Sequence, residues 1–342
     1  MTRPGSAARL VPAVDAPKQA PAPVVSRTFG PEALVAVVRH ANFRATQLGV
    51  GDSPSTLAHV RCPQVSLDML ELGSAMLFKG AMAADLYTIT AIIRCPTPGH
   101  SYNFASAFAD GCIGFYPPGG QAEAMIPRGY GNATLTIPGD RFRQAVDTCF
   151  PELPAAVLRH GAGMKVPAPE FRAVQRLVEI VRATMADPEQ PLASALAREH
   201  LEAELMAAFL TALRGGCGLL VPPPDVRIGR RYQLLARARE LVDAHLTEPM
   251  PIDRLCAELG LSRRSLEYLF NDLLGISPAV YLKRMRLNGV RAALLRSEPE
   301  RGIVKRLALD WGFWHWGHFS KDYGYLFGES PACTCGKQPA CR

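Results

Sequence analysis

The sequence lacks the features that mark membrane and secreted proteins. No run of about 18 apolar residues occurs, so no membrane-spanning helix is expected. The first ten residues also lack the apolar centre of a signal peptide. With 48% hydrophobic residues in 342 positions, the chain still has ample apolar material for about two domains. These features predict a soluble, cytoplasmic protein.

Motifs for catalysis and metal binding are missing too. There is no Gly-x-Ser-x-Gly elbow, no phosphate-binding loop and no dinucleotide fingerprint. The part that reads as strands has only His59 and His100, and no His-x-His pair that a metal-dependent barrel enzyme would use. Of nine cysteines, Cys333, Cys335 and Cys341 cluster at the end without a complete four-ligand pattern. We therefore expect no catalytic residues, no metal and no cofactor.

Excess positive charge is absent from the first two thirds of the chain. Residues 227–342 contain 19 Lys and Arg against 12 Asp and Glu, whereas the preceding residues contain 19 of each. The whole formal excess of +7 therefore lies in the C-terminal part. A phosphate backbone is the natural partner of this asymmetry, although many helical surfaces are modestly basic.

The first half of the chain is expected to form a β domain. Residues 1–30, rich in Pro and Ala, read as a flexible leader. Short β-rich runs then alternate with Gly, Pro, Asp and Asn, which predicts an antiparallel sandwich or barrel. The runs cover residues 42–48, 56–62, 66–72, 75–79, 86–93, 102–108, 112–116 and 133–137.

A β-barrel of this kind can hold a small ligand in its mouth. Aromatic side chains together with one arginine suit an organic ligand, including an anionic one. The candidate effector-binding residues are Tyr87, Arg94, Tyr102, Phe104 and Phe115. For any one of them, an ordinary place in the core is the alternative interpretation.

Helices and a linker follow the strands. A short helix is predicted over residues 138–149, and amphipathic helices over 171–185 and 192–213, which either pack on the barrel or pair with a second subunit. Residues 214–227, rich in Gly and Pro, read as a linker between a domain over 31–213 and another over 228–331. Residues 332–342 are expected to form a flexible tail.

The C-terminal part contains one pattern twice. Helices predicted over residues 252–259 and 263–274, with Gly260 between them, recur over 303–311 and 315–327, with Gly312 between them. The second glycine follows the first by 52 residues, and later landmarks repeat after 53. Each copy reads as a helix-turn-helix, and a long basic helix over 278–296 joins them.

The second helix of each pair should enter the major groove of DNA with its N-terminal end. An arginine can pair with guanine there, and a glutamate can accept a hydrogen bond from cytosine N4. The two copies present different residues, so we expect an asymmetric DNA site. The candidate contacts are Arg263, Arg264, Glu267 and Tyr268 in the first copy and His315, Trp316, Gly317, Ser320 and Lys321 in the second.

This double motif resembles the DNA-binding domain of AraC/XylS-type transcriptional regulators. The resemblance is carried by Leu-Gly-Leu-Ser-Arg-Arg-Ser-Leu at 259–266, Leu-Gly-Ile-Ser-Pro at 274–278, Trp-Gly-Phe-Trp-His at 311–315 and Phe-Gly-Glu-Ser-Pro at 327–331. It covers about a third of the chain. Two departures stand out: Glu267 lies where family members often carry Gln or Arg, and Ala332-Cys333-Thr334-Cys335 replaces a Ser-rich helix start.

The resemblance implies an α+β protein with a jelly-roll (cupin-like) effector and dimerisation domain before an all-α domain of two helix-turn-helix units. It implies a transcription factor, usually an activator, whose partners are double-stranded DNA, a small-molecule effector, RNA polymerase and a second copy of the chain. The alternatives are a repressor, a ligand-independent DNA-binding protein, and a barrel enzyme with an accessory DNA-binding domain.

Overall fold

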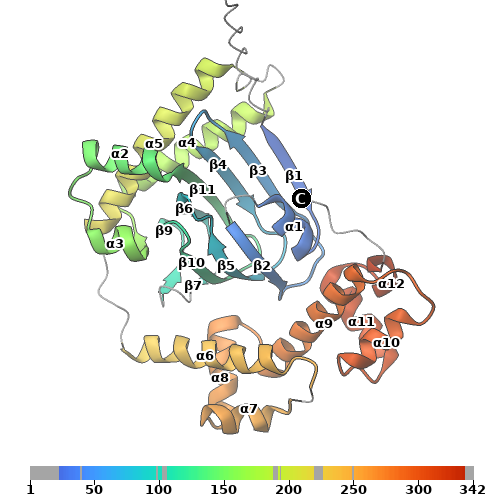
Figure 1. Ribbon diagram of the computed structural model, residues 1–342. Coiled ribbons are helices and arrows are strands. Elements are labelled where there is room, and N and C mark those ends of the chain that lie inside the picture. The colour runs from blue at the N-terminus through green and yellow to red at the C-terminus, as the bar shows by residue number, and fades with distance from the viewer. Residues whose placement is uncertain are drawn as a thin grey trace, which may run out of the picture.

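The computed structural model describes residues 23–335 apart from 39–40, 98, 102–105, 188–191, 193, 219–225 and 249. The N-terminal part is a pair of antiparallel sheets with helices, and the C-terminal part is entirely helical (Figure 1). This α+β arrangement is the predicted one. Within the described residues, no helix is long and apolar enough to cross a membrane.

The larger sheet has seven strands, and every strand pair in it is antiparallel. In spatial order the strands are β1 (Val24–Thr28), β3 (Ser55–Arg61), β4 (Ser66–Glu71), β11 (Gly131–Pro138), β6 (Leu86–Arg94), β9 (Cys112–Tyr116) and β12 (Ala162–Lys165). Because successive side chains of a strand point to opposite faces, each strand contributes to two different layers.

One face of this sheet is covered by helices (Figure 1). Ile89, Phe115 and Leu135 lie on this face, fully buried in one cluster with residues of the covering helices. These helices are α2 (Gly139–Cys149), α3 (Ala155–His160), α4 (Ala168–Ala186) and α5 (Ala195–Gly218). The two long amphipathic helices therefore pack on the sheet and on each other.

The other face of the seven-stranded sheet meets a five-stranded sheet. Its spatial order is β2 (Ala41–Gln47), β5 (Met76–Met82), β10 (Gln121–Ile126), β7 (Gly99–Ser101) and β8 (Ser106–Phe108). Leu57, Leu70 and Ile92 of the larger sheet share a buried cluster with Met76 and Phe78 of the smaller one. Helix α1 (Pro31–Val37) contributes the fully buried Leu34 to the same cluster.

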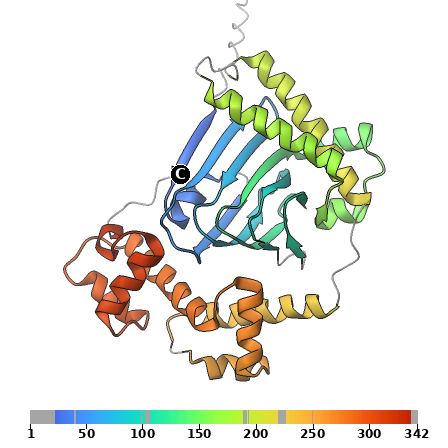
Figure 2. The same cartoon turned by 180° about the vertical axis from the view of Figure 1, so that it is seen from behind.

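The C-terminal domain begins with α6 (Val226–Ala244). The first helix-turn-helix unit consists of α7 (Ile252–Leu259) and α8 (Arg263–Leu274), and the second of α10 (Ile303–Asp310) and α11 (Trp316–Phe327). The long helix α9 (Pro278–Arg296) joins the two units, and α12 (Pro331–Thr334) closes the chain (Figure 2). The predicted double unit is thus present.

The structure differs from the expectation at several places. Residues 24–28, placed in a leader, form β1 and pair with β3. β7, β10 and β12 were not predicted, nor were α1 and α3. α5 continues to Gly218, inside the stretch 214–227 that was predicted to be a linker. The tail was expected to be loose, but α12 forms there, and Thr334 is fully buried.

Candidate nucleic-acid interface

The first unit is shaped by its turn residues. Gly260 ends α7 in the left-handed conformation at φ 64° and ψ 33°, which a Cβ-bearing residue resists. Ser262 then begins α8, and its hydroxyl accepts a hydrogen bond from the backbone N–H of Ser265 at 3.1 Å. The N-terminal end of α8 is therefore firmly capped at the position where a recognition helix meets DNA.

Helix α8 separates an apolar face from a polar one. Leu266, Leu269 and Phe270 are buried in the core that α8 shares with α6, α7 and α9. The predicted contacts Arg263, Arg264, Glu267 and Tyr268 are all exposed, and Tyr268 is 69% accessible. The structure brings these four side chains to one free surface.

The second unit repeats this division with different chemistry. Phe319 and Tyr323 of α11 are buried, as their counterparts in α8 are. His315, Trp316, Gly317 and Lys321 are exposed and Ser320 is half-buried, so all five predicted contacts lie on the accessible side of α11. His315 precedes the helix but forms no side-chain cap.

One exposed aromatic residue beside this surface was missed. Trp314, in the turn before α11, is 74% accessible. The match of Trp311 to Leu259 of the first copy predicts a core position for Trp311, which packs partly buried against the core of the second unit. Trp314 lies two residues before the first residue of α11 and has no helical face, so its exposure was not predictable from periodicity.

Four of the basic residues of α9 bind groups of the protein itself. Arg291 is 6% exposed and binds two carboxylates, and Arg284 donates to the carbonyl of Leu48. Arg286 donates to the carbonyls of Leu246 and Glu248, and Lys283 pairs with Asp322 at 2.9 Å. Most of this charge therefore holds the protein together.

Comparisons with known proteins agree with the geometry of this region. Residues 255–335 match the family described as a helix-turn-helix domain. A probable thc operon regulatory protein of Rhodococcus erythropolis is 33% identical over 122 residues, which are 34% of this chain and 37% of that protein. The XylDLEGF operon transcriptional activator 3 of Pseudomonas putida is 38% identical over 101 residues, 29% of this chain and 30% of that protein.

The C-terminal domain is of the AraC/XylS type. The chain matches only about a third of the length of these curated relatives. The crystal structure of the AraC-like transcriptional activator CuxR aligns over 78% of this chain and 94% of its own, with 11% identity and a TM-score of 0.40.

The AraC/XylS-type domain is in contact with the N-terminal domain through its linking helix. Arg291 donates from Nε to Glu32 of α1 at 2.9 Å and from Nη1 to Glu329 at 2.7 Å. Burial by itself would lower the pKa of Arg291, but the two carboxylates raise it above the usual value. Asn288 and Gln47 of β2 exchange hydrogen bonds of 2.9 and 3.0 Å.

Behind Arg291, a chain of hydrogen bonds reaches the second recognition helix. The Tyr323 hydroxyl donates to Thr334 at 2.8 Å, and Thr334 donates to the Glu329 carboxylate at 2.9 Å. Burial raises the pKa of Tyr323 to about 12, so this hydroxyl keeps its proton at neutral pH. Through Glu329 and Arg291, the chain connects α11 to Glu32 of the N-terminal domain.

The first unit also contacts the N-terminal domain. Leu77 of β5 and Met125 of β10 are paired in register, and both pack in the core of α6, α8 and α9. Arg239 of α6 is 3% exposed and forms an ion pair with Glu123 of β10. The outer face of the five-stranded sheet is therefore the docking surface for the DNA-binding domain.

Of the candidate effector residues that the structure describes, Tyr87 and Phe115 stack on each other at 5.9 Å between ring centroids, in a core and not in a ligand site. Tyr87 and Phe115 lie on the helix-covered face, where Tyr87 stacks on Phe142 at 4.0 Å between ring centroids. Phe115 is fully buried there, and Arg94 is exposed at the end of β6. Tyr102 and Phe104 lie outside the described residues. Tyr87 and Phe115 are thus core aromatics on the face opposite the space between the sheets.

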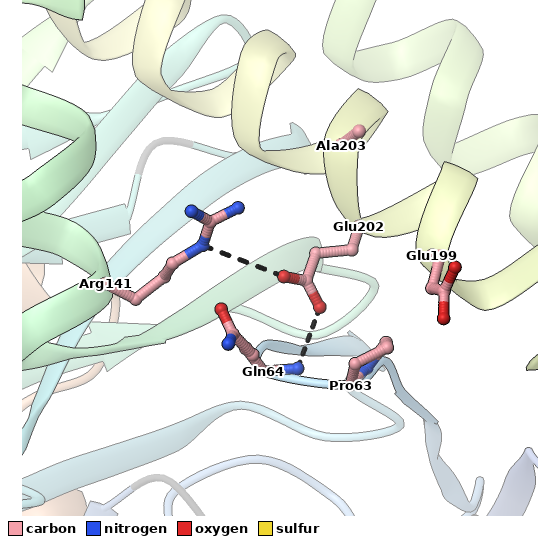
Figure 3. Close-up of a pocket in the computed structure, with 6 residues that line it drawn as sticks. All are labelled: Pro63, Gln64, Arg141, Glu199, Glu202 and Ala203. Atoms are coloured by element: carbon pink, nitrogen blue, oxygen red, sulfur yellow. Dashed lines mark hydrogen bonds and ion pairs between the residues drawn. The ribbon is translucent and has the colours of Figure 1, made fainter. Parts of the chain in front are cut away.

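A polar pocket lies at the edge of the N-terminal domain (Figure 3). Glu202 of α5, 6% exposed, accepts a hydrogen bond from the backbone N–H of Gln64 at 2.8 Å and faces Arg141 of α2 at 3.8 Å. Glu199 and Pro63 lie beside them. Since Glu202 is already paired with protein groups, this pocket ties the β3–β4 turn to the helices.

The cysteines form no metal site in the part of the chain that the structure describes, where no group of three or more His, Cys, Asp or Glu residues has the arrangement to hold an ion. Cys333 is exposed and Cys335 packs partly against the core of the second unit. Cys341 lies outside the described residues.

Proposed function

We propose that this protein is a sequence-specific transcriptional regulator whose two helix-turn-helix units bind successive major-groove faces of double-stranded DNA. The observation that carries the proposal is the exposure of both recognition faces on a shared scaffold of the AraC/XylS type. Two helix-turn-helix units that are joined by one long helix suit DNA half-sites about one helical turn apart, roughly 34 Å.

The two recognition helices favour unequal roles. α8 presents Arg264, which can bind guanine bidentately, and Glu267, which can accept from cytosine. α11 presents Lys321 for phosphate or guanine and Trp316 for a sugar or a thymine methyl group. One subunit therefore reads an asymmetric site.

Control by a small-molecule effector is the second part of the proposal. The DNA-binding domain packs on the five-stranded sheet, whose opposite face belongs to the interior of the N-terminal domain. A ligand that shifts this sheet would act directly on α6 and α9. Coupling of this kind needs two arrangements of the domains that the ligand stabilises unequally.

The proposed function implies further partners. An activator acts with RNA polymerase, and the Pseudomonas putida relative is named as an activator. The exposed apolar residues Ile180 of α4 and Leu196 of α5 suit a homodimer contact. A protein that binds promoter DNA acts in the cytoplasm of a bacterial cell.

The test uses DNA selected from random duplexes with the full chain. Arg264→Ala and Lys321→Ala should each weaken binding to the selected sequence about 10–100-fold, the equivalent of about 1–3 kcal/mol for a lost base contact. Fluorescence anisotropy measures the affinity for selected and for random DNA. Arg237→Ala is the matched control, because Arg237 is exposed on α6 outside both units.

The pattern of losses separates the possible contacts. A loss confined to the selected DNA means that the side chain reads bases. An equal loss on random DNA assigns the side chain to phosphate. Unchanged binding by both variants would show that α8 and α11 are not the reading helices.

A further inference from the structure

The second helix-turn-helix unit contains one residue that the first unit lacks. Up to Phe313, the second copy follows the first by 52 residues, and from His315 onward by 53. Phe313 packs against the core of its unit, as Leu261 does in the first unit. His315 precedes α11, as Ser262 precedes α8. The additional residue is therefore Trp314, which lies between a core position and the start of the recognition helix.

Two large aromatic side chains are open to solvent at this point. Trp314 is 74% accessible and makes no hydrogen bond or ring contact with another residue that the structure describes. Trp316, the first residue of α11, is 48% accessible, although its ring lies against the buried Phe319 at 5.6 Å between ring centroids. Single exposed apolar residues are common, but two tryptophans at the start of a recognition helix indicate a contact surface.

The start of α11 lacks the charged groups that the start of α8 presents. Residues 311–320 contain no Asp, Glu, Lys or Arg, whereas α8 exposes Arg263, Arg264 and Glu267. An indole ring has one hydrogen-bond donor and no acceptor, so it cannot form the bidentate pairs that select guanine or adenine. The two tryptophans therefore suit a base that presents an apolar group.

Gly317 leaves α11 without a side chain at the position where α8 has Arg264. Its φ is not positive, and a Cβ at this position would meet nothing within 4 Å. The fold itself therefore does not require glycine here, and glycine destabilises a helix relative to alanine. Glycine is useful where another molecule approaches the backbone closely. Gly317 thus allows α11 to approach its partner more closely than α8 can.

The same face carries the charge that binding to DNA requires. Lys321 lies four positions after Gly317 on the exposed side of α11 and forms no ion pair with a described residue. The whole positive excess of the chain also lies in residues 227–342. A free cation next to exposed aromatic rings suits the major groove of DNA, where phosphates border the apolar methyl groups of thymine.

We propose that the second unit selects thymine, through contact of Trp314 and Trp316 with 5-methyl groups in the major groove. The thymine methyl group is the apolar feature that the bases present in this groove. Gly317 allows α11 to come close enough for both rings to reach it. This inference rests on the proposed function, in which α11 enters the major groove. It adds Trp314 as a specificity-determining residue and names the base that the second unit selects.

The experiment uses the full chain and the DNA selected from random duplexes, with thymine replaced by deoxyuridine in one half-site at a time. Deoxyuridine pairs with adenine as thymine does and lacks only the methyl group. Fluorescence anisotropy compares the wild type with Trp314→Ala, Arg264→Ala and Phe29→Ala, and thermal unfolding checks that each variant is folded. Phe29 is the matched control, because it is an aromatic residue of the N-terminal domain that is 59% exposed.

We expect deoxyuridine in one half-site to weaken binding of the wild type about fourfold for each contacted methyl group, the value of burying one such group. Trp314→Ala should bind the thymine-containing DNA about tenfold more weakly, because a large apolar side chain no longer becomes buried. This variant should also lose most of the sensitivity to deoxyuridine, whereas Arg264→Ala should retain it. Phe29→Ala should bind both DNAs like the wild type.

Gly317→Ala separates stability from binding. Alanine should preserve or raise Tm, since its Cβ meets no other group and favours the helix. The same methyl group should keep α11 away from the base edges and weaken binding to the selected DNA at least about fivefold, the lower end for a lost base contact. A glycine without a role in DNA binding would show the change in Tm and no change in affinity.

Three results would overturn the proposal: equal affinity for thymine-containing and deoxyuridine-containing DNA, unchanged binding or full deoxyuridine sensitivity in Trp314→Ala, or unchanged affinity in Gly317→Ala. Unchanged DNA binding by Trp314→Ala would assign the exposed ring to a protein partner instead. The proposed DNA-binding function is tested separately, because Arg264→Ala and Lys321→Ala should weaken binding whichever base the tryptophans contact. If those two variants also bind like the wild type, the reading helices themselves are wrongly assigned.

Discussion

Gly289 of α9 lies against the ring of Trp311. A Cβ built on Gly289 would lie 2.0 Å from the indole, closer than atoms can approach. We predict that Gly289→Ala destabilises the second unit by about 1–3 kcal/mol, the usual cost of overpacking, although alanine favours the helix by up to about 1 kcal/mol. Thermal unfolding followed by tryptophan fluorescence measures the change.

Gly317→Ala provides the matched control for this substitution. A Cβ on Gly317 meets nothing within 4 Å, so only helix propensity changes, in the stabilising direction. If both variants unfolded at the same temperature as the wild type, the packing of Trp311 on α9 would be refuted.

For single residues, the sequence predicted the exposed faces of α8 and α11 better than it predicted the buried positions. Helical periodicity correctly separated the exposed Arg264 and Lys321 from the buried Leu266 and Phe319. It could not reveal that Arg291 is buried, because the partner Glu32 lies 259 positions away.

At the scale of elements, prediction succeeded where chemistry marks both ends. α8 carries both marks, the Ser262 cap and Gly275 at its end. Gly260 marks the end of α7 and Ser277 the start of α9, and all three helices have the predicted bounds. β10 was missed because Gln121–Ile126 has two alanines and little β-branched character. β1 and β12 are short edge strands that exist only by pairing with β3 and β9.

The cap of α8 provides a prediction at this scale. Ser262→Ala removes the acceptor of the Ser265 N–H and should lower the free energy of unfolding by about 1 kcal/mol. Ser262→Asn keeps an equivalent cap and should restore most of the loss. Chemical denaturation gives both values. Equal stability of Ser262→Ala and the wild type would mean that this cap contributes nothing to α8.

In the whole molecule, the covering helices, the seven-stranded sheet, the five-stranded sheet and the DNA-binding domain follow one another as layers in this order (Figures 1 and 2). The sequence predicted the two domains and their order along the chain. Their contact could not be predicted, because Leu77 and Glu123 occupy the outward side of their strands, where residues of an antiparallel sheet commonly face solvent. The five-stranded sheet is thus shared between the interior of one domain and the surface of the other.

Because the five-stranded sheet contributes residues to the cores of both domains, we predict that the two domains unfold together. Glu32→Gln removes one charged partner of Arg291 while Glu329 remains, so the loss should be about 1 kcal/mol rather than that of a fully broken buried pair. Calorimetry of the full chain should show one transition in the wild type and an earlier, broader or divided transition in the variant. Glu300→Gln, which affects an exposed pair with Arg306 inside the DNA-binding domain, should leave the profile unchanged. Identical profiles for Glu32→Gln and Glu300→Gln would show that the Arg291 contact does not couple the domains.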